Sequence, residues 1–373
     1  MKTLLITKTL TRGGASSGAR NLLNALRAAG AEVTALDGYA RQRRHPLRAV
    51  RIAERLYERS VHDAETHCLR LGPPVFDLKW LYDLHRPDII QLCDVSGNTI
   101  RFADISRVPC PVAHRLSDFW PYHGARHYAE HPPARPGPAD RLLRRLVFDG
   151  GAMPDCRVAP SHWLADRLGD THVEVIRNAV NIPGSAGPRG AQRGPLRFGF
   201  ISGQVMDPRK GFMALPRLLD AFGKSASVKV ELHIFGRMSP GQVPGPVHVA
   251  MVTHGHFPPG AVSRVYDSFD ILLCPSHLDN SPNVVSEALA HGVPVIGQKG
   301  TGIDSYIQSG TGVLIDFHSG ERTVPAFASA TQQVLDDYAG FSRRAQAYAK
   351  DQLSPLVIGE QYLSLFHRLS KSG

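Results

Sequence analysis

The residues best suited to chemistry lie in segment 274–297, CPSHLDNSPNVVSEALAHGVPVIG, where an apolar strand pattern runs into a helical one. Ser281 is a preferred N-cap residue, and Pro282 suits the first turn of a helix. Such a helix start, just beyond a strand, presents unpaired backbone N–H groups and the positive end of the helix dipole. The segment therefore predicts a phosphate site at residues 281–283 that needs no nearby cation.

Two carboxylates flank this predicted site. Glu287 lies about a turn and a half into the helix, where it can accept hydrogen bonds from the ribose hydroxyls of a nucleotide. Asp279 stands eight residues earlier, in the loop that enters the helix. A solvated helix charge and an ordinary turn residue are the plainer alternatives, but the position of Glu287 after a phosphate-type helix start favours a nucleotide site.

The elements that must position these residues follow a β–α–β rhythm. In the first half we expect a strand at 2–7, a glycine-rich turn at 12–18, a helix at 19–30, a strand at 31–36, and further buried strands within 88–94 and 109–116. After a Gly/Pro/Arg linker the rhythm restarts, with strands at 196–203, 229–236, 271–276 and 294–297 and helices at 211–222, 261–269 and 282–292. This pattern predicts an α/β fold with two parallel sheets, whose ligands bind at the carboxyl ends of the strands.

Length and charge narrow the classes of function. The 373 residues suggest two domains, and the net charge of +10 favours an acidic partner: nucleic acid, an anionic membrane or a phosphorylated ligand. No apolar stretch is long enough to span a bilayer, and the N-terminus lacks a signal-peptide core, so we expect a cytoplasmic protein. The five cysteines are scattered without a CxxC pair, which disfavours a disulfide framework and a structural zinc.

The spacing of Asp279 and Glu287 resembles, with one change, the Glu-x7-Glu signature of the retaining glycosyltransferases of family 4. The version DNSPNVVSEAL is similar to a branch that assembles bacterial surface polysaccharides, where the first carboxylate is Asp. The resemblance implies the GT-B fold: two Rossmann-like domains facing a cleft, with a C-terminal helix crossing back to the first domain. We therefore expect an acceptor domain at 1–183, a linker at 184–195, a nucleotide-sugar domain at 196–350 and a helical tail at 351–373.

Two glycine-rich segments extend the resemblance to the donor phosphates. In 202–212, SGQVMDPRKGF, Lys210 takes the position of the basic residue that holds the donor diphosphate, with Arg209 beside it. Gln204 stands where many relatives have a further basic residue. In 12–23, RGGASSGARNLL, Gly13 and Gly14 resemble the first loop of the family, which lies near the donor phosphates and the acceptor. This loop is not GxGxxG, which disfavours a dinucleotide dehydrogenase.

A fourth segment, residues 115–130, resembles a signature of the polysaccharide branch. The matching residues are Asp118, Trp120, Pro121, Gly124, His127 and Tyr128. Ser117 stands where the family has a histidine that often contacts the transferred sugar. The candidates to replace that histidine in space are His114, His123 and His127.

The resemblance implies a metal-independent enzyme that moves a sugar from a UDP-, GDP- or TDP-linked donor to a hydroxyl acceptor: a glycan, a lipid-linked saccharide or a small natural product. It requires no cofactor besides the donor substrate. The implied catalytic residues are Asp118, Lys210, Asp279 and Glu287. The implied donor-binding residues are Gly13, Gly14, Arg209, Lys210, Asn280, Ser281, Pro282, Asn283 and Glu287. A nucleotide-sugar 2-epimerase-like isomerase and a non-catalytic sugar-nucleotide or glycan-binding relative are the alternatives.

The basic segment 41–60, RQRRHPLRAVRIAERLYERS, is not explained by a donor site. A solvated helix face over a small apolar stripe is one interpretation. The other is a peripheral contact with the inner face of the cell membrane, where a lipid-diphosphate acceptor would be anionic. Nucleic acid is disfavoured, because no recognised binding module accompanies the charge.

Overall fold

A computed structural model describes residues 1–11, 13–39, 73–97, 99–122, 127–128, 152–169, 172–184, 189–190, 194–238 and 248–372. The chain divides into two compact units, the first made of Met1–Ala179 and Pro355–Gly373 and the second of Val180–Ser354. The basic segment 41–60 and the proline-rich segment 132–140 lie outside the described residues.

The first unit contains a parallel sheet of six strands in the order β2-β1-β3-β4-β5-β6. The strands are β1 (Lys2–Thr7), β2 (Glu32–Asp37), β3 (Ile89–Leu92), β4 (Val112–Arg115), β5 (Cys156–Ala159) and β6 (Val173–Val175). The helices are α1 (Gly14–Ala28), α4 (Leu78–His85), α6 (His162–Leu168) and α12 (Pro355–Ser372), with a 3₁₀ helix at Phe102–Arg107.

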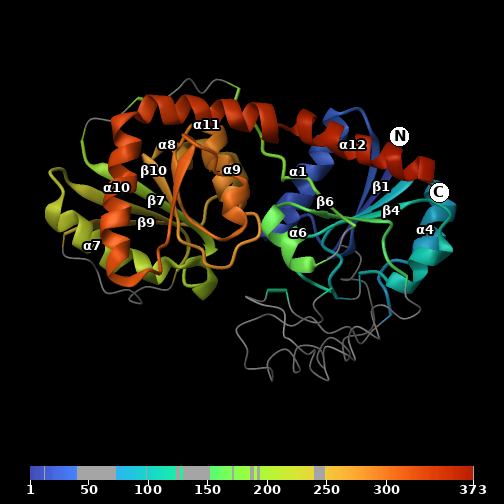
Figure 1. The fold of residues 1–373 in the computed structure, drawn as a ribbon. Coiled ribbons are helices and arrows are strands. Elements are labelled where there is room, and N and C mark those ends of the chain that lie inside the picture. Colours follow the sequence, from blue (N-terminus) through green and yellow to red (C-terminus); the bar gives the residue numbers. More distant parts are fainter. Residues whose placement is uncertain are drawn as a thin grey trace. The chain divides into compact units, whose positions relative to one another are not determined.

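Helix α12, the last element of the chain, packs on α1 within the first unit (Figure 1). Tyr362 and Phe366 of α12 share one buried apolar cluster with Leu22 of α1. Gly359 allows the close approach, because a Cβ there would collide with the carbonyl oxygen of Ala25. The C-terminal helix is therefore part of the first unit, as the resemblance implied.

Helix α1 begins earlier than the sequence analysis expected. The structure has helix from Gly14, where a turn was predicted over 12–18. Gly13, with φ of 90°, is the N-cap, and the hydroxyl of Ser16 donates to its carbonyl oxygen at 2.8 Å. A side chain at Gly18 would collide with the guanidinium of Arg115, so this glycine is a packing requirement and not a turn signal.

The second unit contains another parallel sheet of six strands, in the order β12-β11-β10-β7-β8-β9. Its strands are β7 (Leu196–Gln204), β8 (Val230–Arg237), β9 (Ala250–Gly255), β10 (Ile271–Cys274), β11 (Val295–Gln298) and β12 (Gly312–Ile315). Its α-helices are α7 (Leu215–Ser225), α8 (Val262–Asp267), α9 (Asn283–Ala290), α10 (Thr323–Asp336) and α11 (Tyr338–Leu353). Short 3₁₀ helices lie at Pro208–Lys210, Phe212–Ala214, Pro259–Ala261, Gly302–Ser305 and Gly320–Arg322.

Both faces of this sheet are buried at its central strands, as expected of a parallel sheet between helices. Along β10, Ile271 and Leu273 belong to one apolar cluster, whereas Leu272 and Cys274 belong to the cluster on the opposite face. The two-unit α/β architecture predicted from the β–α–β rhythm is confirmed, and the strands β5, β6, β9 and β12 were not predicted.

The described residues bear on two expectations from the sequence, one about membrane-spanning helices and one about the cysteines. None of the helices in this part of the chain has the length and apolarity needed to cross a membrane. The four described cysteines, Cys93, Cys110, Cys156 and Cys274, are free thiols. Cys68 lies outside the described residues.

Candidate functional site

The segment with the predicted phosphate site connects β10 to α9 in the second unit. The helix begins at Asn283 and its N-cap is Pro282, which makes no side-chain cap hydrogen bond. The predicted N-cap, Ser281, is therefore wrong by one residue; its hydroxyl instead hydrogen-bonds the hydroxyl of Tyr306. The helix ends at Ala290, two residues before the predicted end at 292, and Gly292 follows with φ of 66°. The first turn of α9 thus lacks a side-chain cap, which suits an anion.

Lys210 reaches this segment from the turn that follows β7. The turn Pro208–Lys210 ends at Gly211, which has φ of 70° and sits so close to the Pro275 carbonyl oxygen that a Cβ would overlap it. Backbone hydrogen bonding ties the two loops together, because His277 N–H donates to the Arg209 carbonyl at 3.1 Å. Only glycine combines this φ with this approach, so Gly211 places Lys210 beside the loop that enters α9.

Lys210 and Asp279 form an ion pair between Nζ and Oδ2. The Lys210 side chain is 30% exposed and that of Asp279 is 10% exposed, so the pair is partly shielded from water. The other carboxylate oxygen of Asp279 accepts from the backbone N–H of Ser281 at 3.3 Å. The structure therefore brings together the predicted diphosphate cation and the first carboxylate of the signature, at the entrance to α9.

The 3₁₀ helix Gly302–Ser305 packs against the same entrance. The backbone N–H of Gly302 donates to the carbonyl oxygen of Asp279 at 2.8 Å, and a Cβ at Gly302 would collide with the carbonyl of Asn280. Asn280 is buried, with 4% of its surface exposed. These contacts fix the backbone of residues 279–281, so Asp279 is held rigidly. Gly302 was not among the predicted site residues, although its being a glycine was the available signal.

Glu287 lies on α9 and is part-buried. The hydroxyl of Tyr266, on α8, donates to its Oε2 at 2.9 Å. Burial raises the pKa of the Glu287 carboxyl to about 7, and the Tyr266 hydrogen bond lowers it. Around neutral pH this carboxyl therefore exists in both the protonated and the ionised form, and hydroxyl donors from a ligand would favour the ionised form.

Arg209 points to a different partner from Lys210. Its guanidinium makes two hydrogen bonds to Asp207, from Nε to Oδ1 at 3.1 Å and from Nη2 to Oδ2 at 2.6 Å. Burial raises the pKa of Asp207, but the bonds and charge of Arg209 outweigh it and leave that pKa lowered. The Arg209 charge is thus balanced within its own turn, so the structure does not place it with Lys210 at the α9 entrance.

Gly13 and Gly14 lie in the first unit, at the start of α1 and at the carboxyl end of β1. Both are exposed, and a Cβ built on either would find no atom within 4 Å. Their lack of side chains is therefore not required by packing within the described residues. It leaves the start of α1 open to a ligand.

Asp118 follows β4 in the first unit and forms a pair with His127. The His127 Nδ1 lies 2.7 Å from Asp118 Oδ2, while Asp118 Oδ1 accepts from the backbone N–H of Trp120 at 2.9 Å. The indole ring of Trp120 stacks on the imidazole of His127 with 6.3 Å between centroids. Asp118, Trp120 and His127 therefore form one cluster, with Asp118 orienting the histidine.

Of the three histidines that could replace the one missing at Ser117, the structure describes two. His114 is buried; its Nδ1 pairs with the Tyr122 hydroxyl at 2.9 Å and its Nε2 with the Cys93 carbonyl at 3.1 Å. Burial lowers its pKa to about 4, so it is a neutral core residue and does not serve as the replacement. His127 is the better candidate, and His123 lies outside the described residues, as does Gly124.

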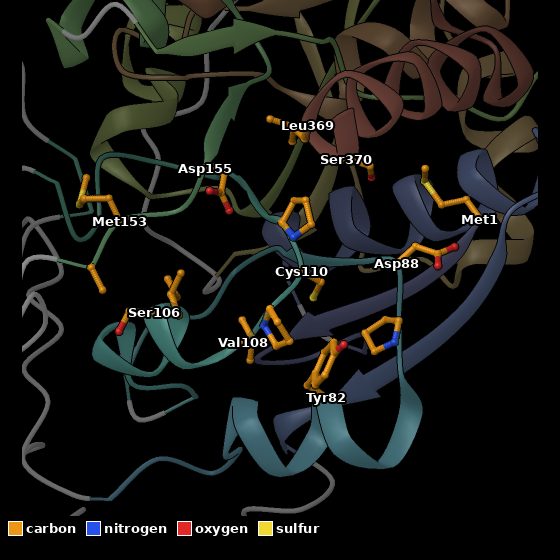
Figure 2. A pocket seen from close by; sticks show the side chains of 15 residues that line it. Met1, Tyr82, Asp88, Ser106, Val108, Cys110, Met153, Asp155, Leu369 and Ser370 are labelled. Atoms are coloured by element: carbon orange, nitrogen blue, oxygen red, sulfur yellow. The ribbon is translucent and has the colours of Figure 1, made fainter. Parts of the chain in front are cut away.

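A cavity of about 970 Å³ in the first unit is separate from these residues (Figure 2). Met1, Asp88, Pro111 and Asp155, which border it, directly precede β1, β3, β4 and β5. The cavity thus opens at the amino ends of the strands, whereas parallel sheets bind ligands at the carboxyl ends. Asp88 accepts from the backbone N–H of Lys2 at 2.7 Å, and Asp155 from that of Val112 at 2.7 Å, so both acids have structural partners.

No group of three or more His, Cys, Asp or Glu side chains able to hold a metal ion occurs within the described ranges.

Two protein-family models match the chain in succession. The model "Glycosyltransferase Family 4" matches residues 12–182, and the model "Glycosyl transferases group 1" matches residues 197–337. The chain is also 24% identical over 254 residues to the Escherichia coli K12 protein WcaC, named as a colanic acid biosynthesis glycosyl transferase. That match covers 64% of this chain, and the chain spans about 60% of the length of this curated relative.

Solved structures with the same fold cover the chain nearly completely. Sucrose-phosphate synthase from Thermosynechococcus elongatus aligns over 100% of this chain and 99% of its own, with a TM-score of 0.64 and 15% identity. HepE from Anabaena, solved in complex with UDP-glucose, aligns over 99% of this chain and 100% of its own, with a TM-score of 0.61 and 16% identity. At these identities the likeness concerns the fold, which is that of two-domain GT-B proteins.

Proposed function

Because the chain belongs to the group 1, family 4 glycosyltransferases, we propose that it transfers a sugar from a nucleoside-diphosphate sugar to a hydroxyl acceptor, with retention of anomeric configuration. The donor would bind the second unit, at the carboxyl ends of its strands. The observation that carries this proposal is the meeting of Lys210, Asp279 and the uncapped start of α9 in one place, with Glu287 one turn further along.

Each of these groups suits one part of the donor. Lys210 and the N–H groups at the start of α9 would hold the diphosphate, and Glu287 would accept from the ribose hydroxyls. Asp279, with its loop fixed by Gly302, would accept from hydroxyls of the transferred sugar. Asn280, Ser281, Pro282 and Asn283 would contribute backbone to the same site. Arg209 would act indirectly, by fixing the Lys210 turn through Asp207.

The chemical step needs stabilisation of the charge that develops on the departing diphosphate. A fixed ammonium and aligned backbone dipoles supply it without reorganising at the moment of reaction. We propose that they do so without a metal ion, so that chelation by EDTA leaves turnover unchanged. The acceptor hydroxyl would attack the anomeric carbon from the face on which the diphosphate leaves.

The first unit would bind the acceptor. The Asp118–His127 pair offers both an acceptor and a donor for sugar hydroxyls, and the Trp120 ring holds His127 in place. Gly13 and Gly14 leave the start of α1 open to a ligand. WcaC is named for colanic acid biosynthesis, which supports a growing surface polysaccharide as the acceptor.

The proposal is tested by incubating the protein with a panel of UDP-, GDP- and TDP-sugars and analysing the products. Release of free nucleoside diphosphate supports transfer or hydrolysis. A changed sugar still attached to its nucleotide would indicate epimerisation, and binding without turnover would indicate a non-catalytic relative. The UDP-glucose bound to HepE makes UDP-sugars the first to try. Lys210→Ala and Glu287→Ala variants should remain folded and lose most donor turnover.

We also propose that segment 41–60 contacts anionic lipid, because its arginines and apolar residues alternate in loosely helical fashion. Replacing Arg41, Arg43 and Arg44 by Glu should reduce pelleting with anionic liposomes. Unchanged pelleting would contradict this part of the proposal.

A further inference from the structure

Tyr266 is buried between two hydrogen-bond acceptors on α9. It is 0% exposed, and its hydroxyl oxygen lies 2.9 Å from Glu287 Oε2 and 3.1 Å from the carbonyl oxygen of Val284. A phenol has one proton to donate. When Glu287 is ionised, the Tyr266 hydroxyl donates to the carboxylate in preference to the Val284 carbonyl, because a hydrogen bond to a charged acceptor is the stronger one.

The Tyr266 ring is held in place by its neighbours. His291, at the end of α9, stacks on it with 4.9 Å between centroids and an interplanar angle of 20°. His291 itself is fixed at both nitrogens, with Nδ1 2.8 Å from the Glu287 carbonyl oxygen and Nε2 3.2 Å from the Ser263 hydroxyl of α8. The ring of Phe269, which follows α8, packs edge-on against the Tyr266 ring with 5.7 Å between centroids. Helices α8 and α9 therefore hold the phenol at a fixed place relative to Glu287.

We propose that Tyr266 is a positioning residue for Glu287: its hydroxyl fixes Oε2, so that the remaining lone pairs of the carboxylate are aimed at the ribose hydroxyls of a nucleoside diphosphate. The inference rests on the proposed function, because it concerns the ribose part of the same donor site. Without this bond the carboxylate could rotate. Ribose binding would then have to order it, and the entropy lost would weaken the affinity for the nucleotide.

The protonation states of the surrounding groups agree with this role. Burial, and then the nearby Glu287 charge, raises the pKa of Tyr266 well above its usual value, so Tyr266 remains a donor. Burial raises the pKa of Glu287 to about 7, and the Tyr266 bond favours the ionised form that the ribose requires. Cys274 of β10, near Tyr266, has a pKa raised to about 12 by burial and stays neutral.

His291 is the remaining titratable group in contact with the pair. Burial lowers its pKa, the bond to the Glu287 carbonyl and the charge of Asp267 raise it, and Arg189 lowers it; the net direction is downward. His291 is thus neutral above neutral pH and does not compete for the Glu287 charge. A change in ribose binding around pH 7 would therefore report on Glu287.

The test compares a ribonucleoside diphosphate with its 2′,3′-dideoxy analogue. UDP, GDP and ADP are first ranked by thermal shift, and calorimetry then gives the Kd of the best one and of its dideoxy form between pH 5.5 and 8.5. We take the Kd of the dideoxy form divided by the Kd of the ribonucleotide. This ratio isolates the contribution of the ribose hydroxyls to binding, because the base and the titrating diphosphate are common to both ligands. For the unmodified protein we expect the ratio to favour the ribonucleotide and to rise with pH through about 7.

In Tyr266→Phe the ratio should fall about tenfold, the size of one hydrogen bond to a charged group, and its rise should move to higher pH. The matched control is Tyr338→Phe, which also removes a buried hydroxyl in the second unit, one that donates to the Asp270 carbonyl at 2.8 Å. Both substitutions should lower stability, but only Tyr266→Phe should change the ratio. Glu287→Gln should lower the ratio and remove its pH dependence.

The outcomes separate the inference from the function on which it rests. Suppose that Glu287→Gln lowers the ratio, whereas Tyr266→Phe leaves both the ratio and the pH at the midpoint of its rise unchanged. Tyr266 then does not position the carboxylate, and the inference is overturned. An equal loss in Tyr338→Phe would show a general effect of stability and would also overturn it. If no nucleotide binds, or Glu287→Gln leaves the ratio unchanged, the ribose assignment in the proposed function fails first.

Discussion

Replacing Lys210 by methionine should sharply weaken donor use while the second unit stays folded. The substitution keeps the length of the side chain and removes its charge. Two unit charges about 4 Å apart interact by about 4 kcal/mol at an effective dielectric constant near 20. The Lys210 side chain is 30% exposed, so screening reduces this contribution to about 2–3 kcal/mol.

A loss of about 2–3 kcal/mol corresponds to a fall of about 30- to 150-fold in kcat/KM for the nucleotide sugar. The variant also leaves the Asp279 carboxylate, with only 10% of its side chain exposed, unpaired beside the incoming diphosphate. Adding Asp279→Asn to Lys210→Met should therefore restore part of the binding of the nucleoside diphosphate, although not the turnover. Such partial recovery would identify repulsion as one component of the loss.

The assay is steady-state release of nucleoside diphosphate, together with calorimetric binding of the same nucleotide. Lys224→Met is the control, because Lys224 is also an ion-paired lysine of the second unit, at 3.5 Å from Asp220 and 60% exposed. Its kcat/KM should stay within about twofold of the original, as expected for an exposed pair. A Lys210→Met enzyme with kcat/KM equally close to the original would refute the assignment of Lys210 to the diphosphate.

Three further predictions concern the acceptor side and the two glycine contacts. Asp118→Asn should raise the acceptor KM about tenfold, because it removes the charge-assisted bond to His127. The donor KM should stay unchanged, because both residues lie in the first unit and the donor is proposed to bind the second. Gly211→Ala should lower the free energy of unfolding by more than about 2 kcal/mol in urea titrations, since φ of 70° and the overlap with a backbone carbonyl are both unfavourable. Gly359→Ala should cost about 1–3 kcal/mol by the same measurement, because its Cβ would push α12 away from the carbonyl of Ala25.

The two glycine predictions have controls within the chain. Gly260 has no positive φ, and a Cβ there would meet nothing within 4 Å, so Gly260→Ala should change stability by less than about 0.5 kcal/mol. Gln361 is exposed on α12, and Gln361→Ala should be equally mild. Equal effects of control and test variants would show that close approach is not what these glycines provide. An Asp118→Asn enzyme with an unchanged acceptor KM would remove Asp118 from the acceptor site.

The sequence predicted the fold well wherever the local pattern was unambiguous. The run KTLLIT has the length and apolarity of a buried strand, and β1 has those bounds. The pattern failed at Gly14–Gly18, where glycines and serines indicate a turn but the structure has helix. Inside that helix Gly18 packs against the Arg115 guanidinium, a contact between residues far apart in the sequence that the local pattern does not reveal.

The candidate site likewise has a part that the local sequence predicts and a part that it does not. Asp279, Lys210 and Glu287 could each be proposed from local spacing and resemblance, but their partners could not. The Lys210–Asp279 pair joins residues 69 positions apart, and the Tyr266–Glu287 bond joins residues 21 apart. Tertiary packing decides such contacts. Arg209 shows the converse, because its neighbour Asp207 occupies a guanidinium that the motif alone placed on the diphosphate.

Hydrogen–deuterium exchange with and without a saturating nucleoside diphosphate tests most directly whether the entrance to α9 is the donor site. We predict slower amide exchange in peptides covering residues 207–212 and 279–287, with little change elsewhere in the second unit. Protection confined to the cavity bordered by Met1, Asp88 and Asp155, with unchanged exchange at 279–287, would contradict it.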